Sequence, residues 1–222
     1  MEKKNKKILI LGAGLLAAFV LWTLLLRFVD VAPIGPEGSS VGFASINGLL
    51  HKLTGVNWLL YTVTDWLGLI PIAAALGFAT LGFAQLIRRK ALFKVDHSIL
   101  ALGVFYAVVI AIYLFFETVI INYRPVLIDG HLEPSYPSST TMLVMCIMPT
   151  AAIQLRGRIK NKLLRQCLIV LIVAFTSFMV IGRILSGVLW ITDIIGGSFF
   201  SVGLVLIYSS VNNTVIKNNC IS

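Results

Sequence analysis

Long apolar runs, separated by short clusters of Lys and Arg, dominate this sequence of 222 residues. An α-helix needs about 20 mostly apolar residues to cross the hydrocarbon core of a bilayer. Six runs approach this length, at residues 8–28, 58–87, 98–121, 139–156, 164–185 and 190–211. Charged residues make up only 12% of the chain, about half their share in soluble domains. The sequence therefore predicts an integral membrane protein of the all-α class, a polytopic bundle of six transmembrane helices.

The positions of the basic residues predict how these helices are oriented. Fourteen of the eighteen Lys and Arg residues lie in four places, Lys3–Lys7, Arg88–Lys94, Arg156–Arg165 and Lys217. Each place adjoins the end of an apolar run, and the intervening loops carry almost no positive charge. This is the positive-inside pattern of cytoplasmic loops, so we expect both termini to be cytoplasmic. It also accounts for the net charge of +9 without a nucleic-acid partner.

The first apolar run is better explained as a membrane span than as a signal peptide. It is about 20 residues long and no small-residue cleavage site follows it, whereas the apolar part of a signal peptide is shorter. We expect one membrane domain over residues 1–222, with the first span at 1–29. Between the first two spans, residues 43–53 could form an amphipathic surface helix. Tryptophans near span ends are typical of interfacial anchors, and the chain has four such residues: Trp22, Trp58, Trp66 and Trp190.

Two polar clusters interrupt the apolar pattern on what should be the outer face. The first, residues 122–141, contains Arg124 and the run Ser138-Ser139-Thr140-Thr141 at a predicted helix start; the second contains Arg183 and Asp193. An arginine side chain offers a bidentate fork to phosphate, and the free N–H groups of a helix start attract anions as well. These residues therefore favour a site for an anionic head group.

The same residues resemble the type 2 phosphatidic acid phosphatase superfamily, the integral-membrane lipid phosphate phosphatases. That family carries Lys-x6-Arg-Pro, then Pro-Ser-Gly-His, then Ser-Arg-x5-His-x3-Asp, on six helices. The corresponding segments in this chain have the same spacing: Glu117-x6-Arg124-Pro125, Pro137-Ser138-Ser139-Thr140 and Gly182-Arg183-x5-Leu189-x3-Asp193. The resemblance covers about residues 55–210 and implies the family's fold.

The departures from the family pattern fall on its catalytic positions. In the family the third-motif His attacks phosphorus, its Asp orients that His, and the second-motif His protonates the leaving group. Here these histidines are replaced by Leu189 and Thr140, and the family's Lys by Glu117. Leu cannot form a phosphoenzyme, and Thr is a poor acid at neutral pH. Glu117, Arg124, Arg183 and Asp193 together carry no net charge, whereas the family's site is strongly positive.

We therefore predict a cell-envelope protein of the plasma or inner membrane, with a degenerate, pseudoenzyme-like phosphate site facing outward. Its leading function is non-catalytic recognition or transport of a lipid phosphate or diphosphate. One alternative is an active lipid phosphatase or phosphotransferase with a rearranged nucleophile, for which His131 is a weak candidate. Another is a structural partner of a different membrane protein.

The expected phosphate ligands come from both polar clusters: Arg124, Ser138, Ser139, Thr140 and Arg183. Glu117 and Asp193 are expected to support them. A structural role is the alternative, with the two arginines paired to Glu117 and Asp193 as buried ions usually are. No cofactor is expected, and the cysteines (Cys146, Cys167 and Cys220) lack metal-ligand spacing.

Overall fold

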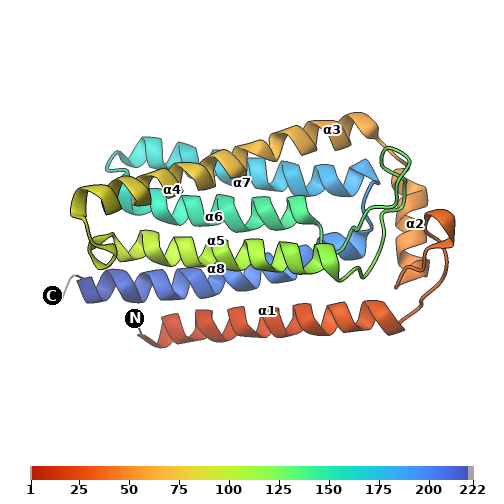
Figure 1. Cartoon of the computed structure of the whole chain (residues 1–222), viewed down its shortest axis with the longest axis horizontal. Helices are drawn as coiled ribbons and strands as arrows, with labels where there is room; N and C mark the ends of the chain where they lie inside the picture. Colours follow the sequence, from red (N-terminus) through yellow and green to blue (C-terminus); the bar gives the residue numbers. More distant parts are fainter. Residues whose placement is uncertain (1, 220–222) are drawn as a thin grey trace.

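The computed structural model describes residues 2–219, and Cys220 lies outside this range. Within it the chain forms eight α-helices joined by turns and two short 3-10 segments, Pro36–Gly38 and Leu92–Lys94. The α-helices are α1 (Glu2–Phe28), α2 (Ala44–Thr54), α3 (Trp58–Leu67), α4 (Leu69–Arg89), α5 (His97–Thr118), α6 (Ser139–Arg158), α7 (Lys162–Ser186) and α8 (Ile191–Asn219). Most of them run side by side along the molecule, and α2 lies across one end (Figure 1). The prediction of an all-helical bundle is confirmed.

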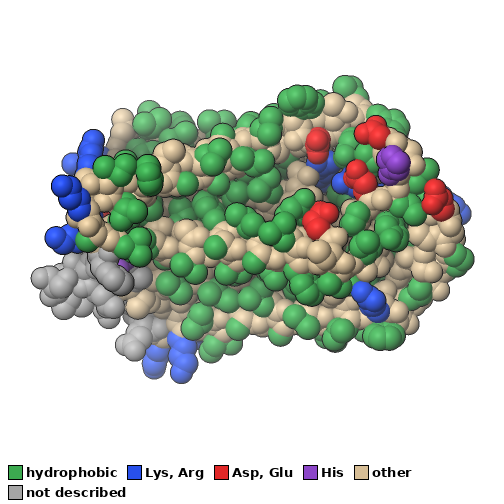
Figure 2. Space-filling view, viewed as in Figure 1, with side chains coloured by type: hydrophobic (Ala, Val, Ile, Leu, Met, Phe, Trp, Pro, Cys, Tyr) green, Lys and Arg blue, Asp and Glu red, His purple; other side chains and the backbone are tan. Residues whose placement is uncertain are grey.

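Five helical segments are long and apolar enough to cross a membrane, by length and composition: Lys3–Phe28, Trp58–Arg89, His97–Thr118, Lys162–Ser186 and Ile191–Thr214. Many of their large apolar side chains are exposed, and such side chains cover the flank of the molecule between its two ends (Figure 2). An exposed apolar flank of this extent belongs in lipid rather than water. The chain is therefore a multi-pass membrane protein.

The remaining long helix, α6, lies inside the bundle. It contacts α4, α5, α7 and α8, and half of its 20 residues are buried, among them Thr141, Thr150 and Gln154. The hydroxyl of Thr150 donates to the backbone oxygen of Cys146 at 2.8 Å. Because other helices surround α6, its polar side chains find partners inside the protein, and α6 needs less apolar character than its neighbours.

The second predicted span is divided into α3 and α4 at Gly68. Pro71 causes this division, because it has no N–H to donate to the carbonyl of Leu67 and its ring crowds that carbonyl. Gly68 retains helical backbone angles, and its N–H donates to the carbonyl oxygens of Thr64 and Asp65. The helix is therefore wound more tightly at Gly68, and α3 and α4 follow each other directly across the bundle.

The predicted surface helix is α2. Its Ile46, Leu49 and Leu53 are exposed, whereas Asn47 is buried and its amide donates to the backbone oxygen of Gly42 and the hydroxyl of Thr192. These bonds fix α2 against the start of α8. This amphipathic helix covers the end of the bundle at which the α5–α6 connection also lies (Figure 1).

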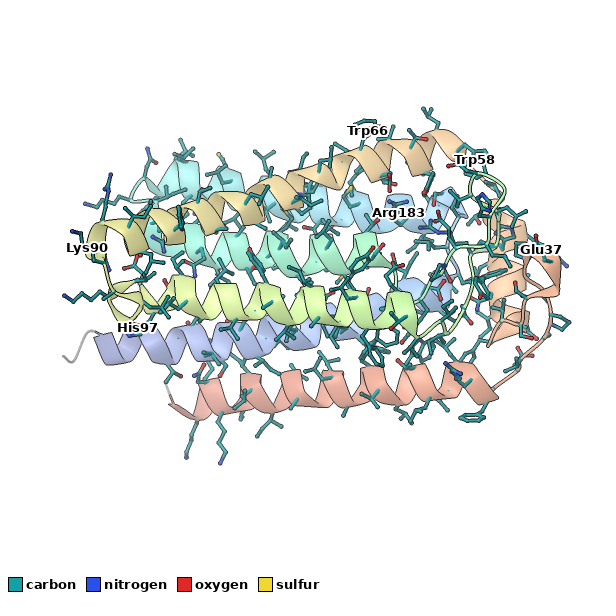
Figure 3. The ribbon with its side chains drawn as sticks, viewed as in Figure 1. Glu37, Trp58, Trp66, Lys90, His97 and Arg183 are labelled. Atoms are coloured by element: carbon teal, nitrogen blue, oxygen red, sulfur yellow. The ribbon has the colours of Figure 1, made fainter. Side chains whose placement is uncertain are left out.

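The two ends of the bundle differ in charge. Basic side chains gather at the end that holds both termini, whereas acidic side chains gather at the opposite end (Figure 2). Lys90 lies at the first end and Glu37 at the second (Figure 3). The basic clusters at residues 3–7, 88–94 and 156–165 therefore lie on one side of the bundle, and the two polar clusters meet on the other.

Candidate phosphate site at the acidic end of the bundle

A cavity of about 300 Å³ opens at the acidic end of the bundle. Its walls come from α5, the connection between α5 and α6, the start of α6, and the turn between α7 and α8. The lining residues include most of the positions singled out in the sequence: Glu117, Arg124, Ser139, Thr140, Arg183 and Leu189. The fold thus brings three segments that are far apart in the sequence to one site.

The start of α6 forms one side of this cavity. Ser138 is the N-cap residue, and its side-chain oxygen accepts the backbone N–H of Thr141. Its hydroxyl is buried and donates to Thr141 Oγ1 at 2.8 Å, so this hydroxyl does not face the cavity. Ser139 and Thr140 do line it. The N–H groups of a first helical turn have no partner within the helix, so they favour an anion at this position.

Arg183 reaches the cavity from the last turn of α7, inside the bundle and near α3 (Figure 3). Only 2% of its surface is exposed. Its Nη2 donates to Asp65 Oδ1 and to Thr140 Oγ1, both at 2.7 Å, and its guanidinium carbon lies 4.9 Å from the centre of the Tyr61 ring. Its Nε is buried without a hydrogen-bond partner. The counter-ion of Arg183 is therefore Asp65, and neither Glu117 nor Asp193, the partners considered in the structural alternative, pairs with it among the described residues.

Arg124 lies in the connection after α5 and approaches the cavity from the other side. Its Nε is 3.1 Å from Glu133 Oε2, close enough for an ion pair. Yet neither Nε nor Nη1 has a partner with hydrogen-bond geometry. The Tyr61 ring lies between the two arginines, 5.8 Å from the guanidinium carbon of Arg124.

Glu117 is not the ion-pair partner of Arg124, contrary to the structural alternative derived from the sequence. Helix α5 ends at Thr118, earlier than the predicted end near residue 121, so Glu117 and Arg124 do not share a helix face. Glu117 lines the cavity with an exposed side chain. Among residues 2–219 it forms no salt bridge.

Asp193 is fully buried next to the site and helps to hold its parts together. Its Oδ1 accepts from the side-chain amide of Asn122 at 3.1 Å, and its Oδ2 accepts from the backbone N–H of Trp190 at 3.2 Å. Its backbone oxygen accepts from the backbone N–H of Ser138. Asp193 therefore joins the α5–α6 connection, the α7–α8 turn and the N-cap of α6. No imidazole takes part in these contacts.

The α7–α8 turn depends on a glycine. Gly187 adopts φ of +64°, and a Cβ atom there would lie 1.7 Å from the backbone oxygen of Gly55. Only glycine fits this close approach. Leu189 follows it, is 8% exposed and lines the cavity. An apolar side chain therefore occupies the place where the resemblance implies a nucleophilic imidazole.

No histidine lines the cavity. His131 is exposed at the tip of the α5–α6 connection, where its backbone pairs with Ile128. His51 of α2 lines a separate cavity of about 70 Å³ on the other side of Leu189, and its Nδ1 is buried without a partner.

Tyr136 also lines the main cavity, but burial raises its pKa, so it remains a neutral phenol. Within the described residues no group of His, Cys, Asp and Glu could hold a metal ion.

Three further residues shape the site although the sequence did not place them among its expected ligands: Asp65, Tyr61 and Glu133. An acidic residue within an apolar run is a signal of function or pairing, so Asp65 could have been linked to a buried arginine. Which arginine it contacts depends on how α3 packs against α7. Tyr61 and Glu133 carry no such signal, because tyrosines near span ends and acidic loop residues are common.

Comparisons with known proteins agree with this arrangement. Residues 115–217 match the PAP2 superfamily family model, a region that contains all three motif-like segments. The fold is similar to that of a transmembrane PAP2-type phosphatidylglycerolphosphate phosphatase from Bacillus subtilis, with a TM-score of 0.60 and 20% identity. The similarity covers 91% of this chain and 95% of that one. No curated protein sequence matches the chain. Over residues 115–217 the chain therefore matches the PAP2 superfamily, and its fold as a whole is similar to that of a PAP2-type membrane phosphatase.

Proposed function

We propose that the cavity binds the phosphate of a membrane lipid head group and that the protein does not hydrolyse it. The observation that carries this proposal is the pair of arginines at the cavity wall. Arg124 Nη1 and Arg183 Nε are buried without hydrogen-bond partners, and Arg124 Nε has only its ion-pair contact with Glu133. Buried donors usually have partners, and phosphate oxygens would supply them here. Ser139 and Thr140 add the free N–H groups of the α6 start.

The same cavity lacks the groups that phosphoryl transfer to the protein requires. Leu189 has no atom that can attack phosphorus. The hydroxyl of Thr140 accepts a hydrogen bond from Arg183, and a neutral threonine is a poor proton donor at neutral pH. Asp193 bonds to Asn122 and to a backbone N–H, so it orients no imidazole. These features favour recognition or transport of the lipid over turnover.

The activity of the purified protein tests this distinction. We expect phosphate release from phosphatidic acid or from a polyprenyl diphosphate to stay at the background rate, because neither Leu189 nor Thr140 can replace a histidine. A colorimetric phosphate assay in detergent measures it. A matched preparation with Arg183→Gln serves as the background control. Turnover that depends on Arg183 and disappears in a His131→Ala or His51→Ala variant would instead establish a rearranged phosphatase.

We further propose that the chain crosses the plasma or inner membrane six times, with both termini in the cytoplasm. Helix α6 supplies the sixth span, because its 20 residues extend over about 30 Å at 1.5 Å per residue, which matches the hydrocarbon core. The orientation is supported by the basic residues at the end with both termini. The phosphate site then faces outward.

Cysteine accessibility in intact cells tests this orientation. The natural cysteines, Cys146, Cys167 and Cys220, are first changed to Ser, and single cysteines are then introduced at Asp129 or Lys160. We expect a membrane-impermeant thiol reagent to label position 129 in intact cells and position 160 only after permeabilisation. The reverse pattern would show that the phosphate site faces the cytoplasm.

A further inference from the structure

Charged groups at the phosphate site are arranged in two layers. The arginines are deep, with side-chain exposures of 15% for Arg124 and 2% for Arg183. The carboxylates lie farther out, with side-chain exposures of 42% for Glu133 and 60% for Asp65, and Glu117 is exposed as well. Figure 2 shows acidic side chains gathered at this end of the molecule. Because Glu117 and Glu133 line the same cavity as the arginines, a ligand bound to the arginines lies close to carboxylates.

The balance of charge disfavours a purely anionic head group. Glu117 and Glu133 line the cavity and Asp65 pairs with Arg183, so these three carboxylates outnumber the two guanidinium groups by one negative charge. A phosphomonoester would add up to two more negative charges in a partly desolvated place, where like charges repel more strongly than in water. A phosphodiester that also carries an ammonium group adds no net charge.

From this layering we infer that the site takes the head group of a zwitterionic phospholipid, a phosphodiester with an attached ammonium group. This inference rests on the proposed function, and it names the lipid class. The phosphodiester would contact the free N–H groups of Arg124 and Arg183. The ammonium group would lie at the opening, against Glu117 and Glu133.

The inference depends mainly on Glu117, because this carboxylate has no cationic partner among the described residues. Asp65 already contacts Arg183 at 2.7 Å, and Glu133 lies 3.1 Å from Arg124. Glu117 lines the cavity without a salt bridge among the described residues. Tyr113, one turn earlier on α5, lines the same wall, and an aromatic face beside a carboxylate suits an ammonium group.

Binding of short-chain lipids to the full-length protein in detergent tests the inference. The panel contains phosphatidylethanolamine, phosphatidylcholine, phosphatidylglycerol and phosphatidic acid of equal chain length. Each lipid is titrated against wild type, Glu117→Gln, Arg124→Gln and Asp129→Asn. The last is the matched control, because Asp129 is an exposed acidic residue of the same connection that does not line the cavity.

We expect wild type to bind one of the two zwitterionic lipids at least tenfold more tightly than phosphatidic acid or phosphatidylglycerol. Glu117→Gln should reduce this preference at least fivefold, and Arg124→Gln should weaken binding of all four lipids. Asp129→Asn should change neither the preference nor the affinities. Tighter binding of phosphatidic acid that is sensitive to Arg124 would overturn the zwitterion inference while supporting a phosphate site. Binding that is unaffected by Arg124→Gln, or no binding, would overturn the proposed function itself.

Discussion

An Asp65→Asn variant is expected to melt at a lower temperature than wild type in detergent, and yet to gain more stability from short-chain phosphatidic acid. Asp65 is the only carboxylate in salt-bridge contact with Arg183 within residues 2–219. Its removal leaves a buried guanidinium without a counter-ion. Breaking a buried pair costs about 3–5 kcal/mol, and solvent screening of the exposed carboxylate reduces this to about 1–3 kcal/mol.

A phosphate ligand should then compensate for the lost carboxylate. Arg183 Nη2 is released from Asp65 in the variant, so it can donate to a phosphate oxygen instead. The extra binding energy appears as a larger rise in melting temperature with lipid concentration. Thermal scans with and without lipid measure both effects.

Asp129→Asn is again the control, and it should leave both the melting temperature and its lipid dependence unchanged. A destabilised Asp65→Asn variant that gains no more from lipid than wild type would indicate that Arg183 has a structural role only. This outcome would leave Arg124 as the sole candidate for phosphate contact.

A Glu117→Lys variant is expected to bind phosphatidic acid at least tenfold more tightly than wild type. The substitution replaces a negative charge by the positive charge that the family resemblance implies at this position. For a phosphate roughly 6 Å away at an effective dielectric of about 20, the change amounts to about 5 kcal/mol before relaxation and water reduce it. Even about a quarter of this energy corresponds to a tenfold change in affinity.

The fold should tolerate this substitution, because Glu117 is exposed and makes no salt bridge within the described chain. The same change should weaken binding of zwitterionic lipids, since the lysine repels their ammonium group. Glu37→Lys is the control: Glu37 lies at the same end of the molecule, outside the cavity (Figure 3). A folded Glu117→Lys variant whose melting temperature is independent of phosphatidic acid would refute the phosphate site.

Much of the helical architecture could be predicted because its signals are local. Hydropathy along the chain fixes where each helix lies, and the predicted runs correspond closely to α1 and α3–α8. The hydroxyl-rich run at residues 138–141 indicated a helix start, and Ser138 is its N-cap. The motif spacing also indicated which residues meet, since Glu117, Arg124, Thr140, Arg183 and Leu189 all line one cavity.

Other features depend on how the helices rotate and pack against each other, which the sequence pattern does not specify. Trp190 lies near a span end, as interfacial anchors do, yet it is buried and its indole N–H donates to the backbone oxygen of Tyr123. His131 lies within the central polar cluster but outside the cavity.

The chain by itself therefore determined where the long apolar helices lie and which residues gather at one end. The tertiary structure decided the ion pairs, Arg183 with Asp65 and Arg124 with Glu133, whereas the structural alternative derived from the sequence had considered Asp193 and Glu117. The physical reason is that hydropathy and capping act over a few residues. A salt bridge across the bundle, in contrast, requires two side chains to come within 4 Å, which only the packing of α3 against α7 and the path of the α5–α6 connection can arrange.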